Sequence, residues 1–491
     1  MIDWVHSLPA VIAALLIALE IVICLAALGV VPRNRKPSTG MAWLILVLAV
    51  PFFGLIAFLF FGSTRVERGR HEKQRRVNTQ IHERTAEIAS LTESTPRLAY
   101  VSSVAALNRN LGALPGVAGN HAVFFEDYHE SIAAMAAEVD TAEQFVHVQF
   151  YITAWDDVTE PFFAALVRAT ERGVTVRLLF DHLGSRGIPV YKDLLKRLEQ
   201  TKVEWHPMMP IMLLKGRWRR PDLRNHRKIL VVDGRVGFAG SQNLIEPGYN
   251  KPKNHKLGRE WVELTTRVNG PAVAELNAVF LTDWYSETDE ILDDTMGQVG
   301  ERSAADEGEL TVQVVPSGPG FATENNLRMF TTLLYSAQRR ISITSPYFVP
   351  DESLLYAVTT AAQRGIEIEL FVSETADQFM VHHAQSSYYE ALLKAGVRIY
   401  LYPAPYVLHS KHFTIDDDVA VIGSSNMDLR SFALNYEVSL MLLGGDVVTR
   451  MRAVEDHYRS LCRELTREEW KQRSFGATYV DTLMRLTSAL Q

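Results

Sequence analysis

The sequence predicts an α/β protein in which two similar sheet domains follow an N-terminal two-helix transmembrane hairpin. The first observation behind this prediction is a set of polar residues that occurs twice at identical spacing, once in each half of the chain. The second is the alternation of short β-rich runs with helical stretches beyond about residue 101, which is typical of α/β sheets. The third is a pair of long apolar runs near the N-terminus.

The hairpin is predicted from these apolar runs, residues 8–31 and residues 41–61, the second of which contains Pro51 and Gly54. Each run is long enough to cross a hydrocarbon core of about 30 Å as a helix. Only the short basic segment 32–37 separates them, so we expect both outer ends on one side of the membrane. A cleaved signal peptide is the alternative for the first run, but no Lys or Arg precedes it and a second span follows directly.

Basic residues around the hairpin predict its orientation. Three lie in the connecting loop, and six follow the second run: Arg65, Arg68, Arg70, Lys73, Arg75 and Arg76. Because basic residues favour the cytoplasmic side, the larger count predicts a multi-pass protein of the cell membrane whose main body is cytoplasmic.

The two halves are expected to contain strands and helices in the same order. In the first half, we expect strands at Phe145–Ile152, Val174–Phe180, Lys228–Val232 and Val236–Ala239, and helices at Glu160–Arg172 and Tyr191–Leu198. In the second half, we expect strands at Arg340–Thr344, Ile366–Val372, Val397–Tyr402, His412–Ile415 and Ala420–Gly423, and helices at Leu354–Arg364 and His383–Ala395.

These elements predict a domain organisation. It comprises the hairpin (1–62), a charged helical stalk (63–100), a first domain (101–286), an acidic linker (287–309) and a second domain with C-terminal helices from about residue 446 (310–491). The linker holds nine acidic residues and one Arg, with few apolar positions. The stalk has only scattered apolar residues, so we expect it to contribute nothing to a core.

Composition excludes several classes of protein. A chain of 491 residues with 47% hydrophobic and 22% charged residues is an ordinary folded protein. The net charge of −7 argues against a nucleic-acid partner, so an anionic substrate must meet a local basic patch. The two cysteines, Cys24 and Cys462, are interpreted as free thiols because Cys24 lies in an apolar run.

The doubled set of polar residues is the main functional signal. In each copy a His is followed by Lys after two residues, Asp after seven, and Gly, Ser and Asn after 14, 15 and 17. The first copy is His226, Lys228, Asp233, Gly240, Ser241 and Asn243, and the second is His409, Lys411, Asp416, Gly423, Ser424 and Asn426. A chance match of six positions is rarer than about one in ten million per start point. The repeat therefore predicts one active site assembled from two halves of the chain.

Two histidines suit chemistry at a phosphodiester. A neutral imidazole is not repelled by the anionic ester and can form a phospho-histidine, which divides one hard displacement into two easier ones. The second histidine can protonate the departing alkoxide. The two imidazoles must then start in opposite protonation states and titrate as a coupled pair.

The other motif residues suit the same reaction. On a strand, a residue two positions after a histidine lies on the same face as that histidine, so Lys228 and Lys411 are expected beside the phosphate. There, two ammonium groups can stabilise the phosphate oxygens without a metal. Asn243 and Asn426 can add neutral donors. No metal or other cofactor is expected, because no Cys accompanies the motif and Lys is not a usual ligand.

The motif aspartates and glycines also have structural interpretations. Asp233 and Asp416 each precede a turn, so they either contact the reacting groups or organise the turn, and both alternatives stay open. Gly240 and Gly423 are expected to allow a close approach of two backbones.

The pattern H-x-K-x4-D-x6-G-S-x-N, present twice, resembles the signature of the phospholipase D superfamily, and the chain is most similar to its bacterial cardiolipin synthase family. Further similar stretches are Trp43 with Pro51, Gly54 and Phe61–Gly62, Gln149–Ile152, Arg177–Asp181, Ser345–Asp351, Asn426–Ser431 and Asn435–Glu437. The resemblance spans nearly the whole chain. It implies two phospholipase D-like domains that face each other.

The resemblance also implies a reaction. One phosphatidylglycerol would form a phosphatidyl-histidine and release glycerol, and a second phosphatidylglycerol would attack it to give cardiolipin. His226 would be the nucleophile and His409 the proton donor. A hydrolase of the same superfamily, which releases phosphatidic acid, is the alternative. A nuclease is disfavoured by the hairpin and the negative charge, and a non-enzymatic scaffold by two complete His-Lys pairs.

Carboxylates are needed to orient the imidazoles. The resemblance implies that Glu437 does so in the second half, 28 residues after His409. In the first half, Glu260 and Glu263 are both candidates.

An apolar stretch and a basic cluster at residues 208–220 also suit the surface of an anionic membrane. We expect this segment to dip into the bilayer. A buried loop with a solvated basic edge is the alternative.

Overall fold

The computed structural model describes residues 10–33, 37–62, 68–84, 99–211, 220–292, 308–375 and 377–486. The chain forms two compact units, Met1–Arg70 and His71–Gln491. Most of the predicted acidic linker, both ends of the predicted stalk and most of the predicted membrane-dipping segment, residues 212–219, lie outside the described residues.

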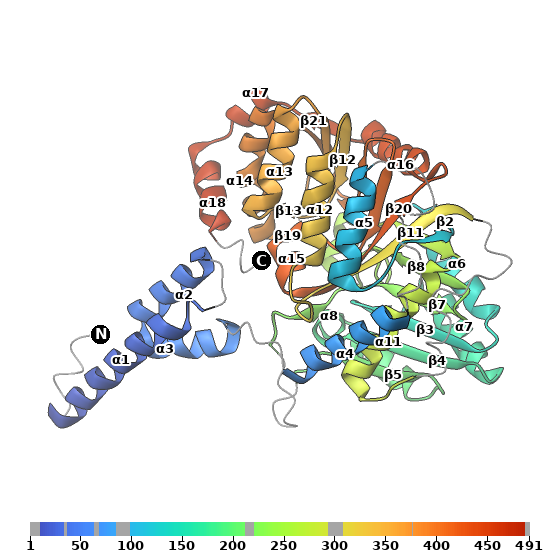
Figure 1. Ribbon diagram of the computed structural model, residues 1–491, viewed down its shortest axis with the longest axis horizontal. Coiled ribbons are helices and arrows are strands. Elements are labelled where there is room, and N and C mark those ends of the chain that lie inside the picture. The colour runs from blue at the N-terminus through green and yellow to red at the C-terminus, as the bar shows by residue number, and fades with distance from the viewer. Residues whose placement is uncertain are drawn as a thin grey trace. The chain divides into compact units, whose positions relative to one another are not determined.

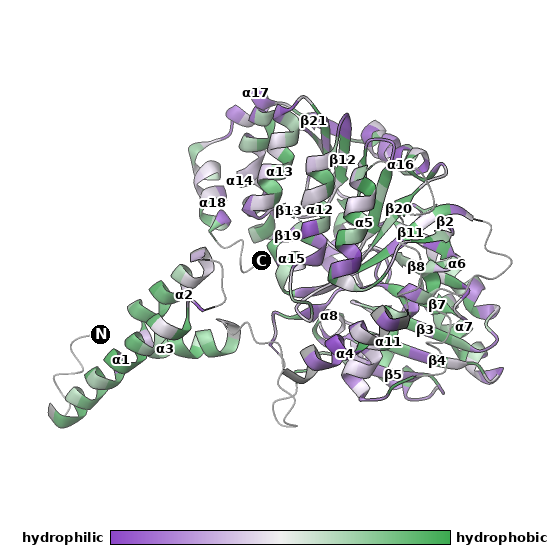
Figure 2. Cartoon of the chain, in the orientation of Figure 1, coloured by the Kyte–Doolittle hydropathy of each residue, from purple (hydrophilic) through white to green (hydrophobic). Residues whose placement is uncertain are grey.

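The N-terminal unit contains one long and several short apolar helices. These are α1 (Ala10–Val30), α2 (Pro37–Ala49), α3 (Pro51–Ala57) and a π-helical turn η2 (Phe58–Gly62). In α1, residues Val11–Val30 are long and apolar enough to cross a membrane, and Figure 2 shows this helix mostly in the hydrophobic colour. The predicted single helix over 41–61 is wrong, because Pro51 lacks an N–H and starts a new helix.

Gly54 allows α3 to pack closely on α2. A Cβ atom at this position would lie 2.7 Å from Leu46 O and from Val47 Cα, so any larger residue would separate the two helices. The apolar cluster of the unit comprises Ile23, Ala27, Val31, Val47 and Phe58.

The second unit contains two sheets with matching strand order (Figure 1). The first sheet runs β2 (His121–Phe125), β10 (Thr265–Asn269), β8 (Val236–Gly240), β7 (Ile229–Val232), β3 (Phe145–Phe150), β4 (Thr175–Asp181), β5 (Glu204–Met208). The second runs β1 (Val117–Gly119), β11 (Gly308–Ser317), β20 (Asn435–Leu443), β18 (Val419–Gly423), β17 (His412–Ile415), β12 (Arg340–Thr344), β14 (Glu367–Ser373), β15 (Arg398–Tyr402), β21 (Arg463–Leu465). Strands β3, β4 and β5 of the first sheet are parallel to one another, as are the corresponding strands β12, β14 and β15 of the second sheet. The other neighbours in these two strand orders are antiparallel. The predicted duplication of an α/β domain is therefore confirmed.

Helices cover the sheets (Figure 1), and the described residues also form five strands of two residues each. The helices are α4 (Arg68–Arg84), α5 (Ala99–Gly112), α6 (Tyr128–Asp140), α7 (Glu160–Glu171), α8 (His182–Arg186), α9 (Tyr191–Leu198), α10 (Pro252–Leu257), α11 (Ala272–Thr288), α12 (Asn325–Ser336), α13 (Glu352–Gln363), α14 (Phe379–Ala395), α15 (Leu429–Ala433), α16 (Val447–Leu461), α17 (Arg467–Lys471) and α18 (Phe475–Arg485). The short strands are β6 (Arg224–Asn225), β9 (Trp261–Val262), β13 (Phe348–Val349) with its partner β19 (Met427–Asp428), and β16 (Val407–Leu408).

One apolar core lies between the two sheets. In β7, Ile229 and Val231 face this shared core, whereas Leu230 and Val232 face the core beneath α6 and α7. The period of two residues explains why this continuous apolar strand is buried on both faces. Leu440 of the second sheet belongs to the same shared core, so the two halves pack face to face.

Two elements depart from the predicted boundaries. Val77 of α4 is 6% exposed and joins the shared core, so the expectation that the stalk contributes nothing to a core is wrong. Lys73 Nζ of the same helix donates to Tyr285 O at 3.1 Å. Helix α5, through Val101 and Val104, packs in the core of the second sheet although the first domain was predicted to begin at residue 101.

Most predicted strands and helices are confirmed to within a few residues, but the outer strands were not predicted. Among the strands that were not predicted, β20 and most of β11 are buried on both faces, and β10 is buried except at Arg267 and Asn269. The C-terminal region expected to be only helical also contains β21, which adds an edge to the second sheet.

Candidate active site

Two short strand pairs cross between the halves and bring the histidines together. Strand β6 pairs with the start of β20, and β16 pairs with β9. The amide of His226 donates to Tyr436 O at 2.9 Å, and that of His409 donates to Val262 O at 2.7 Å. Each histidine is therefore held in register against the opposite half of the chain.

The residue after each of these carbonyls is a buried glutamate that contacts the incoming imidazole. Glu437 Oε2 lies 3.0 Å from Nδ1 of His226, and Glu263 Oε1 lies 2.7 Å from Nδ1 of His409. The expected pairing of Glu437 with the second-half histidine is wrong. Of the two first-half candidates, Glu263 and not Glu260 occupies the equivalent place, and it contacts the histidine of the other half.

The motif serines hold these carboxylates. Ser241 Oγ donates to Glu263 Oε2 and Ser424 Oγ donates to Glu437 Oε2, both at 2.5 Å. These bonds fix the direction of each carboxylate and hence of the imidazole that it contacts. Sequence reasoning assigned the serines no role, and their equal offset in the two copies was the available signal.

Both motif glycines are required by close contact between neighbouring strands. A Cβ atom on Gly240 would lie 2.4 Å from Leu264 O, and one on Gly423 would lie 2.3 Å from Val438 O. The predicted close backbone approach is confirmed. The close approach of the two backbones brings Ser241 next to Glu263 and Ser424 next to Glu437.

The motif lysines are buried directly behind the histidines. Lys228 Nζ donates to His226 O and Lys411 Nζ donates to His409 O, both at 2.6 Å. Burial lowers the pKa of Lys228 to about 7 and that of Lys411 to about 8. Lys411 Nζ also lies 3.0 Å from Nε2 of His409, within reach of any anion that this nitrogen contacts.

The two imidazole–carboxylate pairs differ electrostatically. Burial, with the nearby lysines, holds the pKa of His226 well below its usual value, and burial raises the pKa of Glu437 to about 7. Burial also lowers the pKa of His409, but there Glu263 opposes it. The attraction of His409 and Lys411 outweighs burial and holds the pKa of Glu263 below its usual value. His409 is therefore the imidazole that holds a proton more readily.

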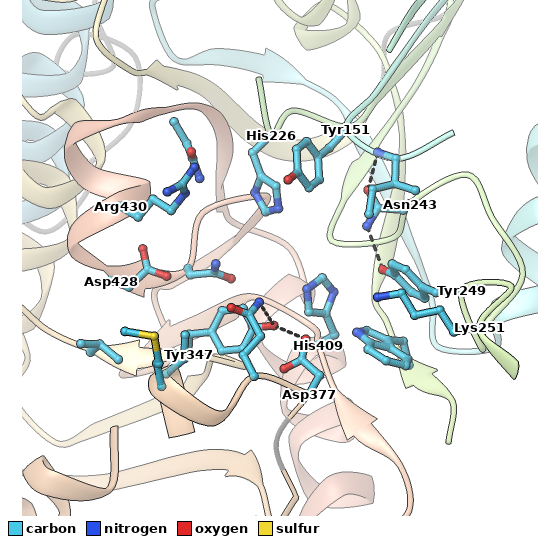
Figure 3. Close-up of a pocket in the computed structure, with 18 residues that line it drawn as sticks. Tyr151, His226, Asn243, Tyr249, Lys251, Tyr347, Asp377, His409, Asp428 and Arg430 are labelled. Carbon is cyan, nitrogen blue, oxygen red and sulfur yellow. Dashed lines mark hydrogen bonds between the residues drawn. The ribbon is translucent and has the colours of Figure 1, made fainter. Parts of the chain in front are cut away.

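Both imidazoles project into one cavity of about 450 Å³ (Figure 3). The ring of Tyr151 meets His226 edge-on at 4.8 Å, and the ring of Tyr347 meets His409 edge-on at 6.3 Å. Charged residues in the described wall are Lys251, Asp377, Asp428 and Arg430, and apolar ones include Ile152, Val349, Met380 and Val381. The cavity can therefore accept a ligand with both polar and apolar parts.

The two motif asparagines also line this cavity. Asn243 Oδ1 accepts from the amide of Ile152 at 3.1 Å, and its Nδ2 donates to Tyr249 OH at 2.8 Å. The backbone N–H of Asn426 donates to Ser431 Oγ at 3.2 Å, which anchors this residue. Both asparagines therefore line the cavity, and the side-chain amide of Asn243 already has a protein partner at each of its two polar atoms.

The motif aspartates lie away from the cavity, beyond the far ends of their strands. Asp233 accepts from the amides of residues 143–145 and Asp416 from those of residues 338–340, at 2.7–2.9 Å. Both have positive φ, 50° and 49°, as turn residues often do. The structure therefore favours the turn-organising alternative for Asp233 and Asp416, and the alternative of direct contact with the reacting groups is wrong.

A buried ionic network beneath His226 was missed. Arg227 Nη1 donates to Asp283 Oδ2 at 2.7 Å, and Arg227 Nε donates to Glu437 O at 3.1 Å. Asn225 Nδ2 donates to the same Asp283 oxygen at 2.8 Å. Arg227 occupies the variable position between His and Lys, so the motif carries no signal for it.

Two matching α/β sheets, each with one His-Lys pair whose histidine lines the same cavity, define a protein of the phospholipase D class. The family described as "Cardiolipin synthase, PLD-like domain" matches residues 135–284 and 330–458, and "Phospholipase_D-nuclease N-terminal" matches residues 21–63. The chain belongs to the cardiolipin synthase family of phospholipase D-like proteins.

Individual relatives agree with this membership. The chain is 29% identical to cardiolipin synthase A of Pectobacterium carotovorum, over 94% of this chain and 95% of the relative. It is 31% identical to the cardiolipin synthase of Geobacillus kaustophilus, over 93% and 90%. Among solved structures, phosphatidylserine synthase of Haemophilus influenzae aligns with a TM-score of 0.57 at 15% identity, covering 79% of this chain and 97% of that one, which supports the fold.

Proposed function

We propose that the protein is a cardiolipin synthase that transfers a phosphatidyl group from one phosphatidylglycerol to another. The observation that carries the proposal is the cavity into which His226 and His409 both project, each held by a carboxylate of the other half. The names of both curated relatives support the same activity. Mixed polar and apolar walls suit the headgroup end of a phospholipid.

In the first step, Nε2 of His226 attacks the phosphorus of phosphatidylglycerol. The bond between phosphorus and the glycerol oxygen breaks, and His409 gives that oxygen a proton, so glycerol leaves. The depressed pKa of His226 suits a neutral nucleophile, and the contact of His409 with Glu263 suits a proton donor.

In the second step, a glycerol hydroxyl of another phosphatidylglycerol gives its proton to His409 and attacks the phosphatidyl-histidine. The bond between phosphorus and His226 breaks, which yields cardiolipin and restores both histidines. Lys228 and Lys411 would stabilise the non-bridging oxygens from behind the imidazoles, and Asn243 and Asn426 would face them across the cavity.

A product assay tests the proposal. The purified protein in liposomes of phosphatidylglycerol, without added metal or nucleotide, should form cardiolipin and glycerol, and His226→Ala should form neither. Mass spectrometry of the lipid extract and an enzymatic glycerol assay measure the two products. Phosphatidic acid without cardiolipin would instead assign the hydrolase reaction.

We also propose that residues 10–62 anchor the body at the cytoplasmic face as a membrane hairpin. The exposed apolar surface of α1 and the apolar α2 and α3 support it (Figure 2). In a variant without its own cysteines, Ser38→Cys at the start of α2 should react with a membrane-impermeant thiol reagent on intact cells. Ser460→Cys, at an exposed position of α16, should react only after permeabilisation. The reverse pattern would reverse the orientation.

A further inference from the structure

Polar side chains next to His409 have an unused capacity for hydrogen bonding. Asp377 and His409 line the same cavity (Figure 3), and Tyr347, whose ring lies 6.3 Å from that of His409, donates its hydroxyl to Asp377 Oδ2 at 2.7 Å. Gln378 Nε2 donates to the same tyrosine oxygen at 3.2 Å, which holds the hydroxyl toward the carboxylate. The other carboxylate oxygen, Oδ1 of Asp377, is buried and has no hydrogen-bond partner among the residues that the structure describes.

Two amide oxygens of the same cavity, Oδ1 of Asn426 and Oδ1 of Asn435, are likewise buried without a partner in the described part of the chain. All three atoms accept hydrogen bonds. Because a buried acceptor without a donor is unfavourable, this wall favours a ligand that brings donors of its own. A polyol is such a ligand, since one hydroxyl can react while another donates to the wall.

The place beside His409 is where the alcohol must lie if His226 is the nucleophile. In an in-line displacement the leaving oxygen departs opposite to the nucleophile. The attacking alcohol of the second step enters along the same line, so it occupies the position that glycerol has left. One carboxylate beside His409 would therefore contact the leaving glycerol and the acceptor glycerol in turn.

Resting on the function proposed above, we infer that Asp377 forms the subsite for the non-reacting hydroxyl of the glycerol headgroup and thereby selects polyol acceptors over monohydric alcohols. That hydroxyl donates to Oδ1, which leaves the reacting hydroxyl beside His409. Tyr347 and Gln378 are positioning residues, because they hold the carboxylate by its other oxygen.

A competition between two soluble acceptors tests the inference. The full-length protein in phosphatidylglycerol liposomes receives equal concentrations of ¹³C-labelled glycerol and 1-propanol. Mass spectrometry then gives the ratio of labelled phosphatidylglycerol to phosphatidylpropanol, which does not depend on the amount of folded enzyme. Asp377→Ala should lower this ratio at least about tenfold relative to the wild type, because a site built to bond a hydroxyl discriminates strongly against an alcohol that lacks it. Asp377→Asn, which keeps the size of the side chain, should lower it in the same direction.

The matched control is Glu374→Gln on the same segment, whose carboxylate accepts from Arg463 Nε at 2.7 Å and is not part of the described cavity wall. This variant should keep the wild-type ratio. An unchanged ratio in both Asp377 variants would overturn the inference. So would a loss seen only when ethanolamine replaces glycerol, because the subsite would then serve an ammonium group. A wild type that makes phosphatidic acid alone from phosphatidylglycerol would overturn the proposed function itself.

Discussion

Replacing His409 with alanine should slow cardiolipin formation from phosphatidylglycerol by about 10²–10⁴-fold, the usual contribution of general acid–base catalysis. The same variant should still release nitrophenol in a burst from a p-nitrophenyl phosphodiester, because nitrophenolate departs without a proton. His226→Ala should lose both reactions, since no phospho-histidine can form. Time courses of lipid product and of nitrophenol measure the two effects.

The two glutamates that contact the histidines, Glu263 and Glu437, provide matched controls for this experiment. Glu263→Gln should reproduce the behaviour of His409→Ala in milder form, and Glu437→Gln that of His226→Ala, because each glutamate contacts the histidine of the other half. A burst retained by His226→Ala and lost by His409→Ala would exchange the nucleophile and the acid. If all four variants lost activity equally on phosphatidylglycerol and on the p-nitrophenyl phosphodiester, the two histidines would not have separate roles.

The histidines and lysines were predictable because their spacing is local. His226 and Lys228 lie between β6 and β7, and their separation of only two residues lets Lys228 Nζ reach the carbonyl of His226 at 2.6 Å. The carboxylate partners were not predictable in the same way. Glu437 lies 211 residues from His226, and the two meet only because β6, a strand of two residues, pairs with β20. A strand that short has no periodicity to detect.

The apolar patterns likewise predicted which segments are buried or apolar better than they predicted where a helix begins or what a strand contacts. Strand β7 was predictable from its continuous apolar run, and the structure adds only that one face meets the opposite half. In the N-terminal unit, length and hydropathy predicted a second helix over residues 41–61, but Pro51 divides it. The rule that Pro favours the first turn of a helix was the stronger signal there.

Replacing Asp283 with leucine should destabilise the second unit by about 3–5 kcal/mol, because it leaves the guanidinium of Arg227 buried without its carboxylate. The two side chains are only 1% and 2% exposed and lie 2.7 Å apart, so water cannot replace the lost partner. Chemical denaturation of the detergent-solubilised protein, followed by tryptophan fluorescence, measures the loss. Activity should fall as well, since Arg227 Nε binds the backbone of Glu437, the residue that contacts His226.

The ion pair between Arg168 and Asp140 is the matched control for burial. It has the same separation, 2.7 Å, but its side chains are 49% and 41% exposed, so Asp140→Leu should cost less than about 1 kcal/mol. Combining Asp283→Leu with Arg227→Met should recover much of the lost stability, because no unpaired charge then remains buried. A double variant as unstable as Asp283→Leu alone would show that the loss comes from the bond to Asn225 or from packing, and not from the stranded guanidinium. Recovered stability without recovered activity would separate the two roles of Arg227, because methionine cannot donate to the carbonyl of Glu437.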